Sequence, residues 1–161
     1  MELILIRHGQ AEAREEKLDD AKRRLTDKGR KKLKKALPGL KTFLKGLEEI
    51  QIWSSPLLRA SETAEILSEG LKLKDISYFD FIADGDFQKF SEQIARIKGK
   101  ACVLVVGHEP YLSEWSQKIC GYNLPFQKGS SASFKVDSVN PISSELQWFI
   151  QSDSFEQISK K

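Results

Sequence analysis

The sequence has few of the side chains that build metal centres and disulfide frameworks. Among its 161 residues are two cysteines and two histidines. Cys102 lies inside an apolar run and Cys120 follows a helical stretch, and this spacing suggests neither a disulfide framework nor a metal site. We interpret both cysteines as small packing residues of a reduced protein and predict a cytoplasmic location.

Long apolar runs are also absent from the sequence. No stretch approaches the length of a transmembrane helix, and the short apolar run near the N-terminus lacks the basic region of a signal peptide. We therefore predict no membrane partner. The net charge of +3 is small and favours neither the presence nor the absence of a nucleic-acid partner. Without repeats or linkers, the chain is expected to form a single domain over 1–161, with a polar tail that frays from about residue 152.

Two short, uninterrupted apolar runs lie at 3–6 and 101–107. Such runs are typical of strands buried on both faces of a parallel sheet. The first leads into Arg7-His8-Gly9 and the second leads into His108-Glu109. Both histidines therefore follow a buried strand at its carboxyl end, where open α/β sheets place ligand sites. We predict that the two histidines share one site.

The spacing of the other apolar residues predicts an α/β fold with a mostly parallel central sheet, helices on both faces and an antiparallel edge. Further strands are expected at 49–53, 76–81, 131–136 and 145–150, and further helices are expected after Thr26 or Asp27, after Ser55, over 87–97 and after Pro110. Pro38-Gly39 is expected to kink or split the first helix. Ser55 is expected to cap the second helix, with Pro56 in its first position.

One face of the first predicted helix is rich in lysine. The simpler interpretation is a solvated face, and the alternative is a docking face for an acidic protein or for RNA. No aromatic residues alternate with the lysines, which weakens the case for RNA, and we predict no nucleic-acid partner. The lysines are Lys31, Lys32, Lys34, Lys35, Lys41 and Lys45.

Two arginines are candidates to join the histidines. Arg7 directly precedes His8, and Arg59 lies one turn into the second helix, where it also suits a surface ion pair with Glu62 or Glu65. Arginines disfavour a metal at the same site because the two cations would repel each other. A phosphoryl group suits the site better, since guanidinium groups grip its oxygens in a forked geometry while a neutral imidazole attacks phosphorus.

Three segments in this order resemble the histidine phosphatase superfamily, which has the phosphoglycerate mutase-like three-layer α/β/α fold. They are Arg7-His8-Gly9-Gln10-Ala11, Ser55–Ala60 followed by Thr63-Ala64, and Val106–Pro110. Residues 25–29 also resemble the family's entry to its first helix. The short chain and Ala11 make the resemblance closest to the SixA-type phosphohistidine phosphatases.

The resemblance implies a role for each matching residue. His8 would be the nucleophile, while Arg7, Arg59 and His108 would bind the phosphoryl group. Backbone N–H groups near Gly9 and Glu109 would add donors, and no metal or cofactor is implied.

Asp84 is the candidate general acid in this interpretation, although Asp84 and Asp86 also suit a turn and a helix cap. In addition, the chemistry requires that His8 be neutral, with its other ring nitrogen donating to an acceptor such as a backbone carbonyl.

The implied activity is hydrolysis of phosphohistidine in a protein, such as a histidine phosphotransfer-type partner. Two alternatives remain open at this point. One is a phosphomonoesterase that uses the same pocket for a small substrate. The other is a non-catalytic module that binds phosphoproteins, which the presence of a nucleophile disfavours.

Overall fold

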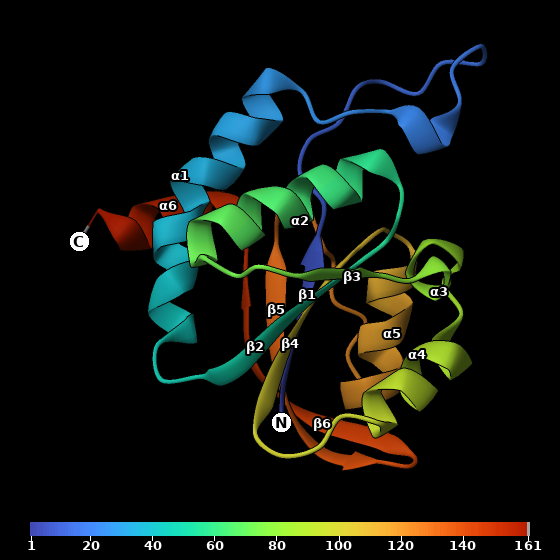
Figure 1. Cartoon of the computed structure of the whole chain (residues 1–161), viewed down its shortest axis with the longest axis vertical. Coiled ribbons are helices and arrows are strands. Elements are labelled where there is room, and N and C mark those ends of the chain that lie inside the picture. The colour runs from blue at the N-terminus through green and yellow to red at the C-terminus, as the bar shows by residue number, and fades with distance from the viewer. Residues whose placement is uncertain (161) are drawn as a thin grey trace.

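The computed structural model describes residues 1–160 and contains one six-stranded sheet in the order β3-β2-β4-β1-β5-β6 (Figure 1). Strands β3, β2, β4 and β1 run parallel to one another, whereas β5 is antiparallel to both β1 and β6. The predicted parallel sheet with an antiparallel edge is therefore confirmed. The strands are β1 (Glu2–Arg7), β2 (Glu48–Ser54), β3 (Ile76–Tyr78), β4 (Ala101–Gly107), β5 (Ser131–Val139) and β6 (Ile142–Ile150).

Helices cover both faces of the sheet, as the three-layer prediction requires. Figure 1 shows α1, α2 and α6 on one side and α3, α4 and α5 on the other. No helix within residues 1–160 is long and apolar enough to cross a membrane. The helices are the short 3₁₀ helix η1 (Asp20–Lys22), α1 (Asp27–Leu44), α2 (Leu58–Leu71), α3 (Asp80–Asp84), α4 (Phe87–Ala95), α5 (Tyr111–Cys120) and α6 (Ser152–Ser159).

The buried positions of β1 and β4 hold unbroken runs of apolar residues because both faces of these strands are covered. In β1, Leu3 and Leu5 pack toward α4 and α5, whereas Ile4 and Ile6 pack toward α1, α2 and α6. Successive side chains of a strand point to opposite faces, so an unbroken apolar run supplies both cores at once. All seven residues of β4 are buried in the same way.

The pairing of β1 with β4 determines where the histidines lie. Arg7 is in register with Gly107, and the backbone N–H of His8 donates to the carbonyl of Gly107 at 3.1 Å. The strands are parallel and end together, so His8 and His108 leave the sheet side by side at its carboxyl edge.

Two helix predictions were wrong in detail. Of the two outcomes expected at Pro38, a kink or a split, the split does not occur, since α1 continues through the proline and buried leucines on both sides hold the helix against the sheet. Helix α2 begins at Leu58 rather than at Pro56, and its N-cap residue makes no side-chain hydrogen bond. In addition, the strand expected at 76–81 ends at Tyr78, and Asp80–Asp84 forms α3.

The expectation of a frayed tail from residue 152 differs from the structure. Residues 152–159 form α6, and Phe155 is only 1% exposed. Its ring lies 6.0 Å from the rings of both Phe43 and Trp148, measured between centroids. Gly39 of α1 allows this close packing, because a Cβ atom there would overlap the backbone of Phe155. One buried aromatic residue thus anchors a mostly polar helix.

We expect Gly39→Ala to lower the free energy of unfolding by about 1–3 kcal/mol, because the added methyl group meets backbone that cannot rotate away. Urea denaturation measures this change. Gly70→Ala is the matched control, since its methyl group would meet only the flexible end of the Leu37 side chain. Equal stabilities for the two variants would contradict the proposed packing of α6 on α1.

Candidate active site

The structure brings the four predicted side chains to one cavity of about 280 Å³ at the carboxyl ends of β1 and β4. Arg7 is the last residue of β1 and His8 follows it, while His108 follows β4 and Arg59 comes from the first turn of α2. The centroids of the two imidazole rings lie 5.1 Å apart, and their planes are inclined at 54°. The two histidines therefore share one site.

His8 is held in one orientation by its own segment of backbone. Its Nδ1 lies 2.7 Å from the carbonyl oxygen of Gly9. A carbonyl can only accept, so Nδ1 carries the proton and Nε2 keeps its lone pair. Burial, followed by the charges of nearby arginines that include Arg59 and Arg7, lowers the pKa of His8 to about 4 against the opposing effect of the Gly9 hydrogen bond. The ring is therefore neutral at pH 7.

His108 is fixed through its other ring nitrogen. Nε2 lies 2.7 Å from Oγ of Ser55, and that hydroxyl oxygen also accepts from the N–H of Leu57 at 3.2 Å. The hydroxyl proton is thus free to be donated to Nε2, which leaves Nδ1 protonated. Burial, and then the charges of His8 and Arg59, lower the pKa of His108 to about 3. His108 is a neutral donor rather than a cation.

The two arginines are anchored by part of each guanidinium group. Arg7 donates to the carbonyl of Phe126 at 2.9 Å, and Arg59 donates to the carbonyl of Asp20 at 2.9 Å and to its carboxylate at 3.1 Å. Burial lowers the pKa of both arginines. The charge of Glu109 opposes this effect at Arg7, and the charge of Asp20 opposes it at Arg59. An arginine nevertheless keeps its proton in proteins.

Three buried nitrogen atoms around this cavity have no hydrogen-bond partner: Nε of Arg7, Nε of Arg59 and Nδ1 of His108. A buried donor without an acceptor costs roughly 1–3 kcal/mol, so such groups are rare unless a ligand satisfies them. All three belong to residues that line the same cavity. The arrangement therefore suits an anion with several oxygen atoms.

Arg59 does not form the surface ion pair that the sequence also allowed. It is 5% exposed and pairs with Asp20 of η1. The carboxylate of Glu62 instead pairs with Arg30 at 2.7 Å and with Arg24 at 3.4 Å.

The expected backbone donor at Gly9 is already engaged within the protein. The Gly9 N–H donates to Oγ1 of Thr63 at 3.1 Å, and that hydroxyl donates to the carbonyl of Arg59 at 2.8 Å. Gly9 therefore links the first strand to the helix that carries Arg59. Glu109 lines the cavity, and its carboxylate accepts from the N–H of Ser113 at 3.0 Å.

Asp84 lies at the end of α3, where its side chain is exposed and does not line the cavity. Asp86 caps α4 by accepting from the N–H of Lys89 at 3.1 Å, which confirms the capping interpretation for that residue. Two other carboxylates, those of Glu12 and Glu109, do line the cavity.

Sequence reasoning missed several residues of the site. Ser55 was interpreted as a helix cap, although its place at the start of the Ser55–Ala60 segment, which contains Arg59, offered a signal. Arg14, Arg23 and Lys128 add positive charge to the cavity, but they come from segments without a periodic pattern. No group of three or more His, Cys, Asp or Glu side chains within residues 1–160 is placed to hold a metal ion.

We expect ¹⁵N NMR of the imidazole rings to show both histidines neutral at pH 6, with His8 in the Nδ1–H form. Protonation should occur only near pH 4 for His8 and near pH 3 for His108. The histidines of the unfolded chain take up protons near pH 6.5, whereas those of the folded protein stay unprotonated until about pH 4 or below. The free energy of unfolding should therefore fall as the pH drops from 6.5 toward 4. Titration of His8 near its ordinary pKa, or an Nε2–H form, would contradict this geometry.

Comparisons with known proteins identify the family of the chain. The family model of the histidine phosphatase superfamily (branch 1) matches residues 3–100. An uncharacterized protein of a Picosynechococcus strain is 35% identical over 135 residues, which cover 80% of this chain and 81% of that protein.

Solved structures share the fold over nearly the whole chain. The protein histidine phosphatase SixA, complexed with tungstate, matches with a TM-score of 0.81 and 23% identity over 96% of this chain and 99% of SixA. A mycobacterial glucosyl-3-phosphoglycerate phosphatase with inorganic phosphate matches with a TM-score of 0.67 and 17% identity over 94% of this chain and 98% of that one. The chain has the SixA-like, phosphoglycerate mutase-like fold and belongs to the histidine phosphatase superfamily.

Proposed function

We propose that this protein removes the phosphoryl group from phosphohistidine in a protein, through a covalent phosphohistidine on His8. Membership of the histidine phosphatase superfamily supports a phosphatase activity. The observation that carries the proposal is the bond from His8 Nδ1 to the Gly9 carbonyl, which leaves the lone pair of Nε2 for attack. The three unpartnered nitrogens around it supply donors for the phosphoryl oxygens.

In the first step, Nε2 of His8 attacks phosphorus. A bond forms between Nε2 and phosphorus, and the bond from phosphorus to the substrate imidazole breaks. When its other nitrogen carries a proton, that imidazole leaves as a neutral molecule, so little help from an acid is needed. In the second step, water attacks the phosphorus on His8, which releases inorganic phosphate and restores the ring.

The negative charge of the transferred group is stabilised by Arg7, Arg59 and His108. Phosphoryl transfer depends chiefly on positioning and on electrostatic stabilisation of the equatorial oxygens. The two guanidinium groups supply the positive charge, and neutral His108 supplies a further N–H. Their anchors at Phe126, Asp20 and Ser55 hold these donors in place before substrate arrives.

The preference for a phosphoprotein rests on the leaving group and on the fold. Asp84, the candidate general acid, lies outside the cavity, and a phosphoramidate needs an acid less than a phosphoester does. The structure with a TM-score of 0.81 is that of a protein histidine phosphatase. We further propose that the protein acts in the cytoplasm, where its two free cysteines would stay reduced.

A small phosphomonoester is the second candidate substrate. The carboxylates of Glu12 and Glu109 line the cavity and would supply the proton that an alkoxide leaving group needs. A phosphatase of a small glycosyl phosphoester also shares the fold.

Trapping with ³²P-labelled phosphohistidine protein tests the catalytic assignment. We expect a phosphoenzyme that is labile in acid and stable in alkali, as a phosphoimidazole should be. His8→Gln should form none of it, whereas His108→Gln should form it more slowly, because only His8 bonds to phosphorus. A labelled His8→Gln protein would refute the nucleophile.

Substrate class is tested separately by comparing kcat/KM for a phosphohistidine protein and for sugar phosphates. Higher kcat/KM for the sugar phosphates would favour the second candidate. Phosphate binding without turnover of either substrate would indicate a non-catalytic binding module.

Ser55→Ala should lower kcat/KM by about three- to tenfold, because a lost hydrogen bond typically costs about 0.5–1.5 kcal/mol and His108 would lose its anchor. Ser54→Ala is the matched control. Ser54 is equally buried, but its hydroxyl donates to the carbonyl of Ser55 and does not contact His108. Equal losses in the two variants would show that Ser55 acts only through folding.

A further inference from the structure

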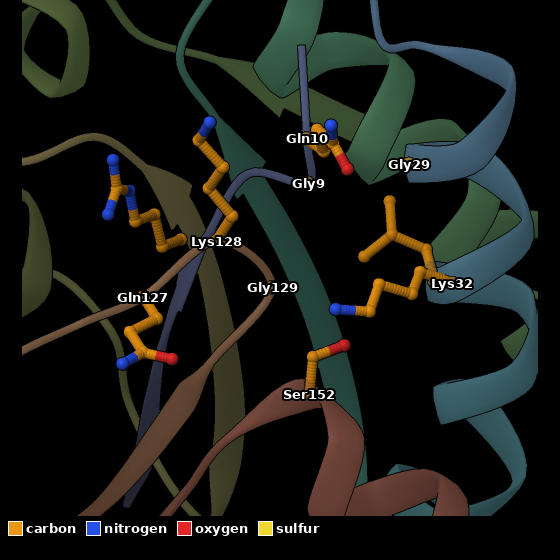
Figure 2. Close-up of a pocket in the computed structure, with 10 residues that line it drawn as sticks. Gly9, Gln10, Gly29, Lys32, Gln127, Lys128, Gly129 and Ser152 are labelled. Carbon is orange, nitrogen blue, oxygen red and sulfur yellow. The ribbon is translucent and has the colours of Figure 1, made fainter.

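A second cavity, of about 330 Å³, lies directly beside the one that holds the histidines. Arg7 and Lys128 line both cavities, so these two side chains form a shared wall. Figure 2 shows the second cavity between α1, the start of α6 and the loop before β5. The chemistry proposed above uses only the first cavity and leaves this one without a role.

The second cavity has a mixed lining that includes Leu33, and its charged side chains are all positive. Lys32 reaches in from α1, and Arg7 and Lys128 contribute from the shared wall. No Asp or Glu is among the lining residues. Lys32 does pair with Asp153 at 3.0 Å, but Asp153 is exposed and lies outside the lining, so the cavity keeps an excess of positive charge.

Ser152 is a buried polar residue in the lining of this cavity. It is only 7% exposed, and its hydroxyl has no hydrogen-bond partner among residues 1–160. Figure 2 shows that hydroxyl pointing into the cavity, toward the region that the Lys32 amine also enters. Ser152 is the first residue of α6, and no side chain caps that helix. The positive end of the helix dipole therefore adds to the attraction for a negative group.

We propose that the second cavity binds a carboxylate carried by the same substrate whose phosphoryl group occupies the histidine cavity. This inference rests on the proposed function and names a second recognition element for it. The Ser152 hydroxyl and the Lys32 amine supply donors that a carboxylate accepts. The carboxylate comes from an acidic side chain of a phosphoprotein or from the acid group of a small phosphoester.

Binding of non-hydrolysable phosphonates tests the cavity without requiring turnover. Calorimetry would compare phosphonocarboxylates of increasing chain length with alkylphosphonates of the same length. We expect the best phosphonocarboxylate to bind about fivefold more tightly than its partner, the upper range for a single exposed ion pair. This advantage should disappear in Lys32→Gln and persist in Lys31→Gln. Lys31 is also an exposed lysine of α1, but it does not line the cavity.

Hydrolysis then distinguishes the two sources of the carboxylate. Phosphohistidine peptides that differ by one Glu→Gln change would be compared with a phosphoglycerate and its amide. If the Glu peptide has a lower KM than the Gln peptide, and Lys32→Gln removes this difference, the carboxylate comes from a protein. If the phosphoglycerate has a lower KM than its amide, and Lys32→Gln removes that difference, the carboxylate comes from a small molecule. Both results support the cavity.

Two results would overturn the inference. One is equal affinity of wild-type protein for phosphonocarboxylates and alkylphosphonates at every chain length. The other is equal loss of the carboxylate advantage in Lys31→Gln and Lys32→Gln, which would indicate diffuse charge on α1. If only the proposed function is wrong, wild-type protein will still bind phosphonocarboxylates more tightly than alkylphosphonates, but it will hydrolyse no phosphohistidine substrate.

Discussion

The in-register parallel pairing of β1 with β4 is the constraint on which the site depends. It places His8 and His108 next to each other where both strands end, although one hundred positions separate them in the sequence. A slip of one residue would turn every side chain of a strand to the opposite face and move it out of the core that it fills into the other one. Both faces of these strands are buried, so the cores on the two sides of the sheet hold the register that aligns the imidazoles.

Burial of the site also sets its chemical state. Two imidazoles placed among buried guanidinium groups lose water, and the cost of charging them lowers the pKa of His8 to about 4 and of His108 to about 3. A neutral ring is what a nucleophile requires. The arginines keep their protons and are held by Phe126 and Asp20, and in the function that we propose the donors left unpaired bind the phosphoryl oxygens. The same buried environment therefore keeps the proposed nucleophile, His8, uncharged and places positive charge around it.

The sequence predicted those parts of the fold and the site that leave a local signal. Unbroken apolar runs identify β1 and β4, and a histidine after each run identifies the shared site. The supporting contacts leave no such signal, because Ser55, Thr63 and Asp20 meet their partners only after the chain has folded. Pro38 misled the prediction for the same reason, since tertiary packing of α1 outweighs a local preference.

The least predictable part of the chain is also the part best placed to discriminate between substrates. Polar composition suggested that residues 152–159 would fray, yet a single buried ring, Phe155 against Gly39, fixes α6 on α1. This contact delivers Ser152 to the wall of the second cavity. Phosphoryl transfer needs the same few groups whatever the leaving group is, and in the function that we propose they lie at the ends of β1 and β4 and in the first turn of α2. Recognition of the remainder of a substrate falls to peripheral elements, whose positions depend on contacts between residues far apart in the sequence.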